Sequence, residues 1–419
     1  MSAGNGTLTW PAADLSRVPY RVFFDPAVYE REQVQVFRGP TWCYLALEAE
    51  IPNPGDYRTT CIGDTSVVVN RGLDGRIHAF ANRCAHRGTT LVRHLSGNAK
   101  SHTCIYHHWN YDLEGNLQGV PFQRGAKGKG GMPASFDKRA HGLFKVRVAT
   151  YRGIVFGTMH PETEPLDDYL DRPMRGYLDE IFCKPIEVLG YMRQVIPANW
   201  KLYFENLHDP YHAGLLHQFQ TTFGIFSNSQ RGGSIMDKER RHRIGYSIHG
   251  SASEAETKAG YAGTTIYNEA LTLEDPSIVA FIDEMGDGKA VNMMTVFPAV
   301  FFQRLTNTLA TRRIRPKGPT AFELYWTFFG YTDDTPEVRR ARLRQVNLVG
   351  PGGLVSMEDG EAGVQVQRAM AGGGNTHSVL EMGGTGPIED QDTINTEVPI
   401  RGFWRHYCKL MGYQPESTG

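Results

Sequence analysis

The spacing of hydrophobic and polar residues changes twice along the chain. Residues 15–38 alternate charged and apolar side chains at helical spacing, and Pro26 stands where that helix would open. From residue 41 to about residue 160 the pattern becomes short β runs between turn residues, and beyond 161 helical and strand patterns mix. We therefore expect a small all-β domain at 41–160, inserted between residues 1–40 and 161–419, which together form a larger domain.

Two hairpins are predicted inside the all-β region. Residues 66–70 and 76–80 flank a turn that contains Gly72 and Gly75. Residues 104–112 and 117–120 flank a second turn, which is centred on Gly115. Both turns place glycine where a tight reversal between antiparallel strands requires it.

The larger domain is predicted to combine helices with an antiparallel sheet. Apolar runs joined by short polar links, as in a meander, occur at 293–303, 308–315 and 322–331. Helical patterns occur at 198–218, 337–348, 361–371 and 399–411. The expected fold class is α+β: an all-β domain inserted into an α+β domain whose central antiparallel sheet is surrounded by helices.

Composition narrows the class of protein. The 419 residues are 40% hydrophobic and 21% charged, which is ample for two or three domains with real cores. A formal net charge of −1 argues against nucleic acid or another polyanion as partner. The most apolar segments, such as 296–302, are too short to span a membrane. Residues 1–10 lack the features of a signal peptide, so we expect a cytoplasmic protein.

Four of the potential metal ligands form two pairs of cysteine and histidine. Cys84 and His86 are one pair, Cys104 and His107 the other, and residues 87–103 separate them. In a Rieske centre two thiolates hold one iron and two imidazoles hold the other. Zinc accepts the same donors, but zinc loops usually pair cysteine with cysteine and histidine with histidine. The pairs therefore predict a Rieske [2Fe–2S] cluster.

A second group of potential ligands lies at residues 205–217. His212 and His217 are five residues apart, and Asp209 precedes His212 by three. Two imidazoles and one carboxylate, with positions left open, form the site of non-haem Fe(II) oxygenases. The third ligand is expected in the run 356–361, which holds three acidic residues.

Two other functions fit the first group of ligands alone. One is a Rieske electron carrier, and the other is an interaction module stabilised by zinc. Both leave the second group and most of the larger domain without a role, and iron content distinguishes them from an oxygenase.

With both groups in this order, the chain resembles the α subunits of Rieske ring-hydroxylating oxygenases. Within that family it is most similar to the branch that acts on benzoate-type acids: terephthalate dioxygenase, salicylate hydroxylases and anthranilate dioxygenase. The resemblance covers nearly the whole chain and rests on the stretches 82–88, 130–135, 199–206, 350–360 and 401–404.

The resemblance implies a role for each ligand position. Cys84, His86, Cys104 and His107 would hold the cluster, and His212, His217 and Asp359 would hold Fe(II). Asp209 would link the Rieske histidine of a neighbouring subunit to an iron-ligating histidine. Glu358 directly precedes Asp359, so the carboxylate assignment depends on the resemblance more than the histidines do.

The resemblance also implies partners. The chain would be the terminal oxygenase component, using O₂ and electrons from NADH that arrive through a ferredoxin, a reductase or both. The α subunits of the family form trimers, usually with three small β subunits (α3β3, otherwise α3). Both monohydroxylation and dihydroxylation remain open.

The expected substrate is a small aromatic acid. An aromatic carboxylate needs an apolar slot for the ring and a cation or donors for the charge. The resemblance to terephthalate enzymes implies Arg312 and Arg401 as carboxylate contacts, and salt-bridged surface arginines are the alternative. Salicylate or anthranilate is the first expectation, terephthalate or a halobenzoate the second, and O-demethylation of a methoxy-aromatic a more distant one.

Overall fold

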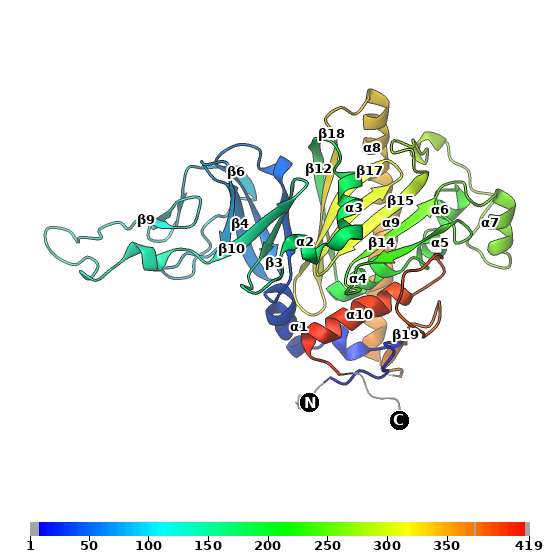
Figure 1. Ribbon diagram of the computed structural model, residues 1–419, viewed down its shortest axis with the longest axis horizontal. Helices are drawn as coiled ribbons and strands as arrows, with labels where there is room; N and C mark the ends of the chain where they lie inside the picture. Colours follow the sequence, from blue (N-terminus) through cyan, green and yellow to red (C-terminus); the bar gives the residue numbers. More distant parts are fainter. Residues whose placement is uncertain (1–7, 373, 415–419) are drawn as a thin grey trace. The chain divides into compact units, whose positions relative to one another are not determined.

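The computed structural model describes residues 8–372 and 374–414. The chain divides into two compact units. The smaller unit is the continuous segment Phe37–Leu166, and the larger unit is formed by the described residues on both sides of it. Each unit has its own main sheet, coloured blue to cyan in the smaller unit and green to yellow in the larger (Figure 1).

The smaller unit is all-β apart from short 3-10 turns, as predicted. Its main sheet is antiparallel, in the order β2-β11-β10-β5-β4-β3-β6, and β7, β8 and β9 form a second sheet. The strands are β2 Cys43–Leu47, β3 Asp56–Ile62, β4 Thr65–Arg71, β5 Ile77–Ala81, β6 Ser96–Asn98, β7 His102–Thr103, β8 Asn110–Tyr111, β9 Leu117–Gly119, β10 Lys145–Tyr151 and β11 Ile154–Thr158. The short turns are η3 Glu48–Glu50 and η4 Lys138–His141.

The two predicted hairpins have different outcomes. The first is present as β4 and β5, with Arg71 paired to Ile77 across the turn. The second is shorter than predicted, because residues 104–108 form a loop and the strand β8 begins only at Asn110. The pattern of apolar residues could not distinguish this ligand-bearing loop from a strand.

The larger unit is built on a second antiparallel sheet, in the order β12-β18-β17-β16-β15-β14-β13. Its strands are β12 Ile186–Ile196, β13 Gly232–Met236, β14 Arg243–Ile248, β15 Lys289–Val296, β16 Val300–Leu305, β17 Thr308–Pro316 and β18 Phe322–Tyr331. The predicted run 293–303 is therefore two strands, because the chain reverses at Phe297–Ala299. The predicted meander is β16, β17 and β18 together with the end of β15.

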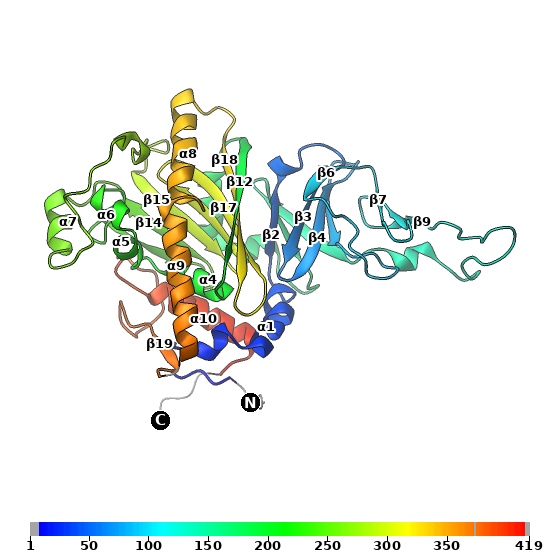
Figure 2. The ribbon, with the colours of Figure 1, turned by 180° about the vertical axis from the view of Figure 1, so that it is seen from behind.

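Helices cover both faces of this sheet, which confirms the predicted fold class. Figure 2 shows α8 and α9 following one another along one face, and Figure 1 shows α3 in front of the other. On that side the Tyr177 hydroxyl of α3 contacts the carbonyls of Asn292 and Phe302 at 3.0 and 3.1 Å. The helices are α2 Leu166–Tyr169, α3 Asp171–Ile181, α4 Trp200–His208, α5 Ala213–Leu216, α6 Gln218–Thr222, α7 Glu254–Gly260, α8 Pro336–Val349, α9 Leu354–Ala369 and α10 Val398–Met411, with short turns η5 Pro276–Ile278 and η6 Met370–Gly372.

Two helical predictions need correction. The first helix was expected over 15–38, but Arg17–Pro19 is a strand, β1, paired with β19 His377–Val379. Helical structure begins with the 3-10 turn η1, Tyr20–Phe23, and continues with α1, Pro26–Glu32, which Asp25 caps, and the π-helical turn η2, Gln33–Phe37. Pro19 lacks the N–H that a helix interior needs, so the chain stays extended before it.

The second correction concerns residues 198–218, which were expected as one helix. The segment is three short helices, α4, α5 and α6, and the breaks fall at residues 209–212 and at His217. Pro210 ends α4, since proline cannot continue the hydrogen-bond ladder of a helix. Asp209, His212 and His217 therefore lie at helix ends.

Among the described residues, no helix is long and apolar enough to cross a membrane.

Candidate metal centres

The two ligand loops of the smaller unit have the same backbone hydrogen-bond pattern. In each, the cysteine N–H donates to the carbonyl five residues later, and the cysteine carbonyl accepts from the N–H four residues later, at 2.8–3.0 Å. That later position is Gly88 in one loop and His108 in the other, and both adopt left-handed φ angles of +73° and +56°. Two loops of one shape thus present a thiol and an imidazole each.

The four side chains at these loops fit a Rieske cluster. Cys84 and Cys104 are 3% and 2% exposed, and the rings of His86 and His107 lie 4.6 Å apart. Nδ1 of His86 is buried and has no hydrogen-bond partner among the described residues. Buried ring nitrogens are normally satisfied, and a metal ligand needs this nitrogen free. The donor set and the unpartnered nitrogen both match a [2Fe–2S] cluster held by two thiolates and two imidazoles.

Two aromatic residues pack around these ligands. Trp109 stacks on His86 with ring centroids 4.6 Å apart and planes 3° apart, which shields the imidazole from water. The Tyr111 hydroxyl lies 3.3 Å from Cys84 Sγ and accepts from the Ala85 N–H at 3.2 Å. Burial and the neighbouring Cys84 raise the pKa of Tyr111, so the hydroxyl stays protonated and can donate to the sulfur. Such hydrogen bonds to cluster sulfurs tune the reduction potential.

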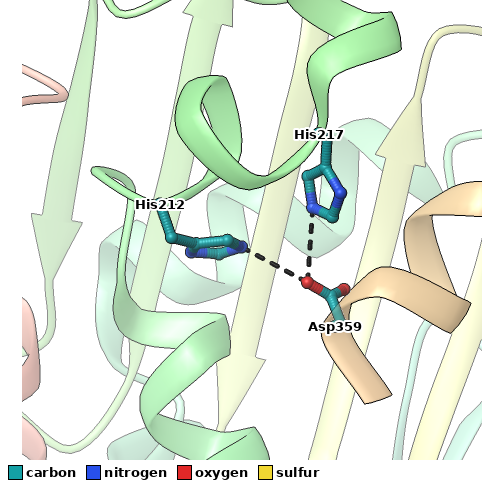
Figure 3. A group of neighbouring side chains, drawn as sticks. All are labelled: His212, His217 and Asp359. Carbon is teal, nitrogen blue, oxygen red and sulfur yellow. Dashed lines mark ion pairs between the residues drawn. The ribbon is translucent and has the colours of Figure 1, made fainter. Parts of the chain in front are cut away.

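In the larger unit, His212, His217 and Asp359 converge on one point (Figure 3). Nε2 of His212 lies 3.5 Å from Asp359 Oδ1, and Nε2 of His217 lies 3.3 Å from the same oxygen. The three potential ligand atoms all lie within 4.8 Å of one another. The histidines come from the ends of α5, and the aspartate comes from the second turn of α9. Two imidazoles and one carboxylate fit a mononuclear Fe(II) site.

The other nitrogen of each imidazole is held by the protein. His212 Nδ1 lies 2.7 Å from the backbone carbonyl of Asp209, and His217 Nδ1 lies 2.7 Å from Glu358 Oε2. Carbonyl and carboxylate oxygens only accept, so each Nδ1 carries the proton. When a metal ion replaces the second proton, each Nε2 would present its lone pair to the site, which is the tautomer that metal binding needs.

The electrostatics of the site favour a cation. Burial alone would lower the pKa of His212, but hydrogen bonds to Asp209 and Asp359 outweigh it and raise the pKa to about 10. Burial would raise the pKa of Asp359, but His217 and His212 outweigh it and hold that pKa below its usual value. A buried site that stabilises positive charge on its histidines will also stabilise a divalent metal ion, which replaces the proton.

Asp209 is placed beside His212 but outside the group of three. Its Oδ1 accepts from the backbone N–H groups of Tyr211 and His212 at 2.8 and 3.2 Å, and its Oδ2 lies 3.6 Å from His212 Nδ1. The carboxylate thus orients the turn that carries His212. It also lines a second hollow of about 320 Å³, together with the carboxyl groups of Glu205 and Glu397. Burial raises the pKa of Glu205 to about 8.

Asn206 belongs to the site, although the sequence did not single it out. Its Nδ2 donates to Asp359 Oδ1 at 3.0 Å and lies 3.2 Å from His212 Nε2. It precedes Asp209 by three residues on the same helical turn, a spacing that brings side chains together on one helix face. From the sequence, Glu358 was only an alternative to Asp359 as the iron ligand. In the structure its carboxylate instead accepts a hydrogen bond from Nδ1 of His217.

A cavity of about 80 Å³ opens onto the three ligands. Its walls are mostly apolar, with Val291, Met293, Phe301, Leu305, Val355 and Ile394 among the lining residues. Polar groups are few and include Gln220, Tyr246, Arg243 and Arg312. This combination of an apolar slot with a few charged donors suits an aromatic acid.

Arg312 faces this cavity, and the strand geometry explains why. In β17 it lies opposite Phe301 of β16 and Trp326 of β18, so its guanidinium is held 4.7 and 4.1 Å from their ring centroids. It donates to Gln303 Oε1 at 2.8 Å and to the Tyr203 hydroxyl at 2.9 Å. The residue is 2% exposed and has no carboxylate partner among the described residues.

Arg401 does not reach the cavity, in contrast to the expectation from sequence. It is 1% exposed in α10, and its guanidinium donates to the carbonyls of Asp14 and Gly386 at 3.0 and 2.8 Å. Those contacts turn it toward the N-terminal segment and the loop before α10. These two main-chain carbonyls occupy Nη1 and Nη2, and Nε has no hydrogen-bond partner among the described residues.

The chain matches two known families along most of its length. Residues 41–142 match the Rieske [2Fe-2S] domain, and residues 168–412 match the ring hydroxylating alpha subunit (catalytic domain). The chain is 51% identical to the anthranilate 1,2-dioxygenase large subunit of Burkholderia cepacia, covering 96% of this chain and 95% of that one. It is 43% identical to terephthalate 1,2-dioxygenase, terminal oxygenase component subunit alpha 2, of Comamonas sp, covering 98% and 99%.

A third relative and a solved structure agree with these matches. The large oxygenase component of salicylate 5-hydroxylase from Ralstonia sp is 41% identical over 96% of both chains. The crystal structure of naphthalene 1,2-dioxygenase from Rhodococcus sp. bound to indole has a TM-score of 0.78 and 27% identity over 94% of both chains. The protein is thus an oxidoreductase with a Rieske [2Fe–2S] cluster and non-haem iron, dependent on O₂ and an electron donor. This chain belongs to the family of Rieske ring-hydroxylating oxygenase α subunits.

Proposed function

We propose that this large subunit hydroxylates a benzoate-type aromatic carboxylate, with salicylate or anthranilate as the first candidates. The observation that carries the proposal is Arg312, a buried guanidinium without a carboxylate partner among the described residues, at the wall of the cavity beside the iron ligands. A buried unpaired charge is costly unless a ligand compensates it. The carboxylate of an aromatic acid is the matching group. The relatives named for anthranilate, terephthalate and salicylate support the same class.

We further propose which residues hold the metals. Cys84, His86, Cys104 and His107 would bind the Rieske cluster, and the Nε2 atoms of His212 and His217 with Asp359 would bind Fe(II). When bound, the cluster passes single electrons and the Fe(II) supplies the site at which O₂ is activated. The carbonyl of Asp209 and the carboxylate of Glu358 would hold the two imidazoles in the required tautomer.

The chain's remaining tasks are to bind the ring and exclude water. The apolar walls formed by β15, β16 and α9 would hold the aromatic ring over the ligands, and Arg312 would fix its orientation through the carboxylate. The orientation decides which ring carbon faces the iron, and both monohydroxylation and dihydroxylation are compatible with it.

We propose that Asp209 connects the electron source to this site. Its carboxylate accepts from the backbone N–H of His212, and the residue lines both the cavity at the iron ligands and the second hollow. A Rieske histidine from a neighbouring subunit would dock at that hollow, as in the trimer that the family resemblance implies. We also propose a small β subunit, with α3β3 as first choice and α3 as second. A ferredoxin or reductase would carry electrons from NADH, and the location would be cytoplasmic.

Two other substrate classes are alternatives to the first candidates. Terephthalate and halobenzoates also carry the carboxylate that Arg312 requires. A Rieske O-demethylase acting on a methoxy-aromatic acid would use the same metals, and formaldehyde among its products would reveal it.

A substrate screen tests the proposal. The holoenzyme, with a surrogate reductase and NADH, is given salicylate, anthranilate, terephthalate, 2-chlorobenzoate and a methoxybenzoate, and the products are identified by mass spectrometry. Naphthalene and toluene serve as aromatic controls without a carboxylate. We expect O₂-derived oxygen only in products from acids. Turnover of the hydrocarbons without turnover of any acid would refute the proposal.

A further inference from the structure

A second guanidinium, that of Arg243, lines the cavity beside the iron ligands. The residue is 7% exposed and forms no salt bridge among the described residues; burial lowers its pKa, and the charge of Asp209 only partly opposes that shift. Arg241 and Arg304, also buried in the larger unit, are paired with Asp237 at 3.1 Å and with Asp287 at 2.6 Å. Arg401 is buried and forms no salt bridge among the described residues, but it donates to two main-chain carbonyls. Of these four arginines only Arg243 lines the cavity beside the iron ligands.

A structural role accounts for only part of the Arg243 side chain. Its Nη1 donates to the carbonyl of Leu207 at 2.9 Å, and its Nε donates to Ser234 Oγ at 2.9 Å. The first contact satisfies a carbonyl in the last turn of α4, where a cation is favourable. Nη2 has no hydrogen-bond partner among the described residues, so its two N–H groups remain for a ligand.

Gly245 is the reason that this guanidinium can lie at the cavity wall. It stands two residues after Arg243 on the same face of β14, and both residues line the cavity. A Cβ at position 245 would lie 2.4 Å from Arg243 Nη2 and 2.6 Å from its Cζ. Only a residue without a side chain leaves space for the guanidinium to lie flat there.

We propose that Arg243 holds a second hydrogen-bond acceptor of the substrate, while Arg312 holds the carboxylate. This deepens the proposed function and rests on it. An arginine only donates, so the matching group is a hydroxyl oxygen or a second carboxylate. The amino group of anthranilate would place its N–H donors against the N–H donors of Arg243. The substrate class is thereby narrowed to aromatic acids with a second oxygen substituent, of which salicylate is the simplest.

Binding measurements test this without turnover. Salicylate, benzoate and anthranilate are titrated calorimetrically into anaerobic holoenzyme, and the quantity compared is the ratio of Kd values between ligands. We expect wild-type protein to bind salicylate roughly tenfold or more tightly than benzoate, as for one hydrogen bond to a charged group, with anthranilate close to benzoate.

Two variants test whether Arg243 contacts the bound acid or only supports the structure of the site. Arg243→Gln removes the charge, and Gly245→Ala keeps the charge but displaces the guanidinium, because the new Cβ would lie 2.4 Å from Nη2. In both variants we expect the ratio of the benzoate Kd to the salicylate Kd to fall to about two or less. The benzoate Kd itself should change by less than about threefold. Gly190→Ala is the matched control, since a Cβ in that strand meets nothing within 4 Å.

Each result of these titrations has a stated consequence for the inference. An unchanged ratio in Gly245→Ala, or equal loss of salicylate and benzoate in both variants, would overturn the inference even if Arg243→Gln fails to fold. Equal binding of salicylate and benzoate by wild-type protein would also overturn it while leaving the proposed function intact. If none of the three acids binds wild-type protein, the inference is overturned and salicylate and anthranilate fail as first candidates of the proposed function.

Discussion

At the scale of single residues, the iron site depends on which atom of each side chain faces inward. Glu358 and Asp359 are neighbours on α9, but only Asp359 Oδ1 lies near the Nε2 atoms of both histidines. Successive residues of a helix point about 100° apart, so the two carboxylates cannot share one role. Glu358 instead accepts from Nδ1 of His217. The arrangement supports the proposal that Asp359 binds the metal and that Glu358 orients the ligand His217.

Replacement of Asp359 by alanine should remove the mononuclear iron. With one of three ligands lost, we expect the iron content to fall from about three to about two per chain, the two of the cluster. The visible spectrum of the cluster should remain, and metal analysis by mass spectrometry measures the change. Glu361→Gln, an exposed position on the same helix, is the control that should retain all the iron. Full iron content in Asp359→Ala would contradict the assignment.

Replacement of Arg312 by alanine should weaken the binding of aromatic acids. The lost charged hydrogen bond corresponds to about 1.4 kcal/mol or more, so we expect KM to rise roughly tenfold or more. Steady-state kinetics with the best acid of the screen measures this. Arg315→Ala is the matched control, because Arg315 lies on the opposite face of β17 beside Glu323. An unchanged KM in Arg312→Ala would remove this residue from the substrate site.

At the scale of elements, the breaks between α4, α5 and α6 bring the ligands together. Five residues on a continuous helix would turn the two histidines about 140° apart. His217 instead adopts φ −93° and ψ 75° between α5 and α6, and the His212 and His217 rings lie 5.6 Å apart. The breaks convert two helix positions into one metal site. The backbone groups left free at these helix ends also hold the metal-ligating side chains. The carbonyl of Asp209, for example, accepts a hydrogen bond from Nδ1 of His212.

A buried ion pair holds the helices behind the site together. Glu32 of α1 accepts from Lys201 Nζ at 2.6 Å and Trp200 Nε1 at 2.9 Å in α4, and from the Tyr407 hydroxyl of α10 at 2.5 Å. Glu32 and Lys201 are 0% exposed. Burial lowers the pKa of Lys201 even though Glu32 opposes that shift, so the ammonium depends on its partner to remain charged.

Replacement of Glu32 by glutamine should destabilise the larger unit. Leaving a buried ammonium without its carboxylate costs about 3–5 kcal/mol. For a unit of this size we expect the midpoint of thermal unfolding to fall by roughly 6–20 °C. Differential scanning calorimetry measures the shift, and Asp333→Asn, in an exposed pair with Lys184, should move the midpoint by no more than about 2 °C. Equal midpoints for the two variants would refute this role.

At the scale of the whole molecule, two units with different architectures each contribute one metal site. In the smaller unit, Cys84, Cys104 and Trp109 belong to the same hydrophobic core as Phe80 and Val68 of the sheet. Loss of the cluster should therefore disturb the packing of that unit as well as its redox chemistry. In the larger unit the proposed iron ligands lie at the ends of α5 and in α9.

Replacement of Asp209 by asparagine should separate the two sites functionally. Asparagine keeps the size and the acceptor toward the Tyr211 and His212 N–H groups but removes the charge. We expect an unchanged cluster spectrum and iron content, with turnover nearly abolished. Single-turnover reduction, in which the cluster is reduced in advance, measures whether electrons still leave it. Normal turnover in this variant would rule out Asp209 as the link.

The amino-acid sequence was sufficient to indicate a Rieske cluster and non-haem iron, because most of the proposed ligands form short-range patterns. Cys84 with His86 and Cys104 with His107 lie so close in sequence that spacing alone brings each pair together. His212 and His217 are five residues apart, and the helix breaks at these positions bring their rings together. The α+β class followed from hydrophobic periodicity for the same local reason. Tertiary structure alone decided the division of roles between Glu358 and Asp359, the displacement of Arg401 from the cavity, and the inclusion of Asn206 and Arg243. These depend on which distant segments meet and which way a side chain turns, and neither is encoded in local spacing.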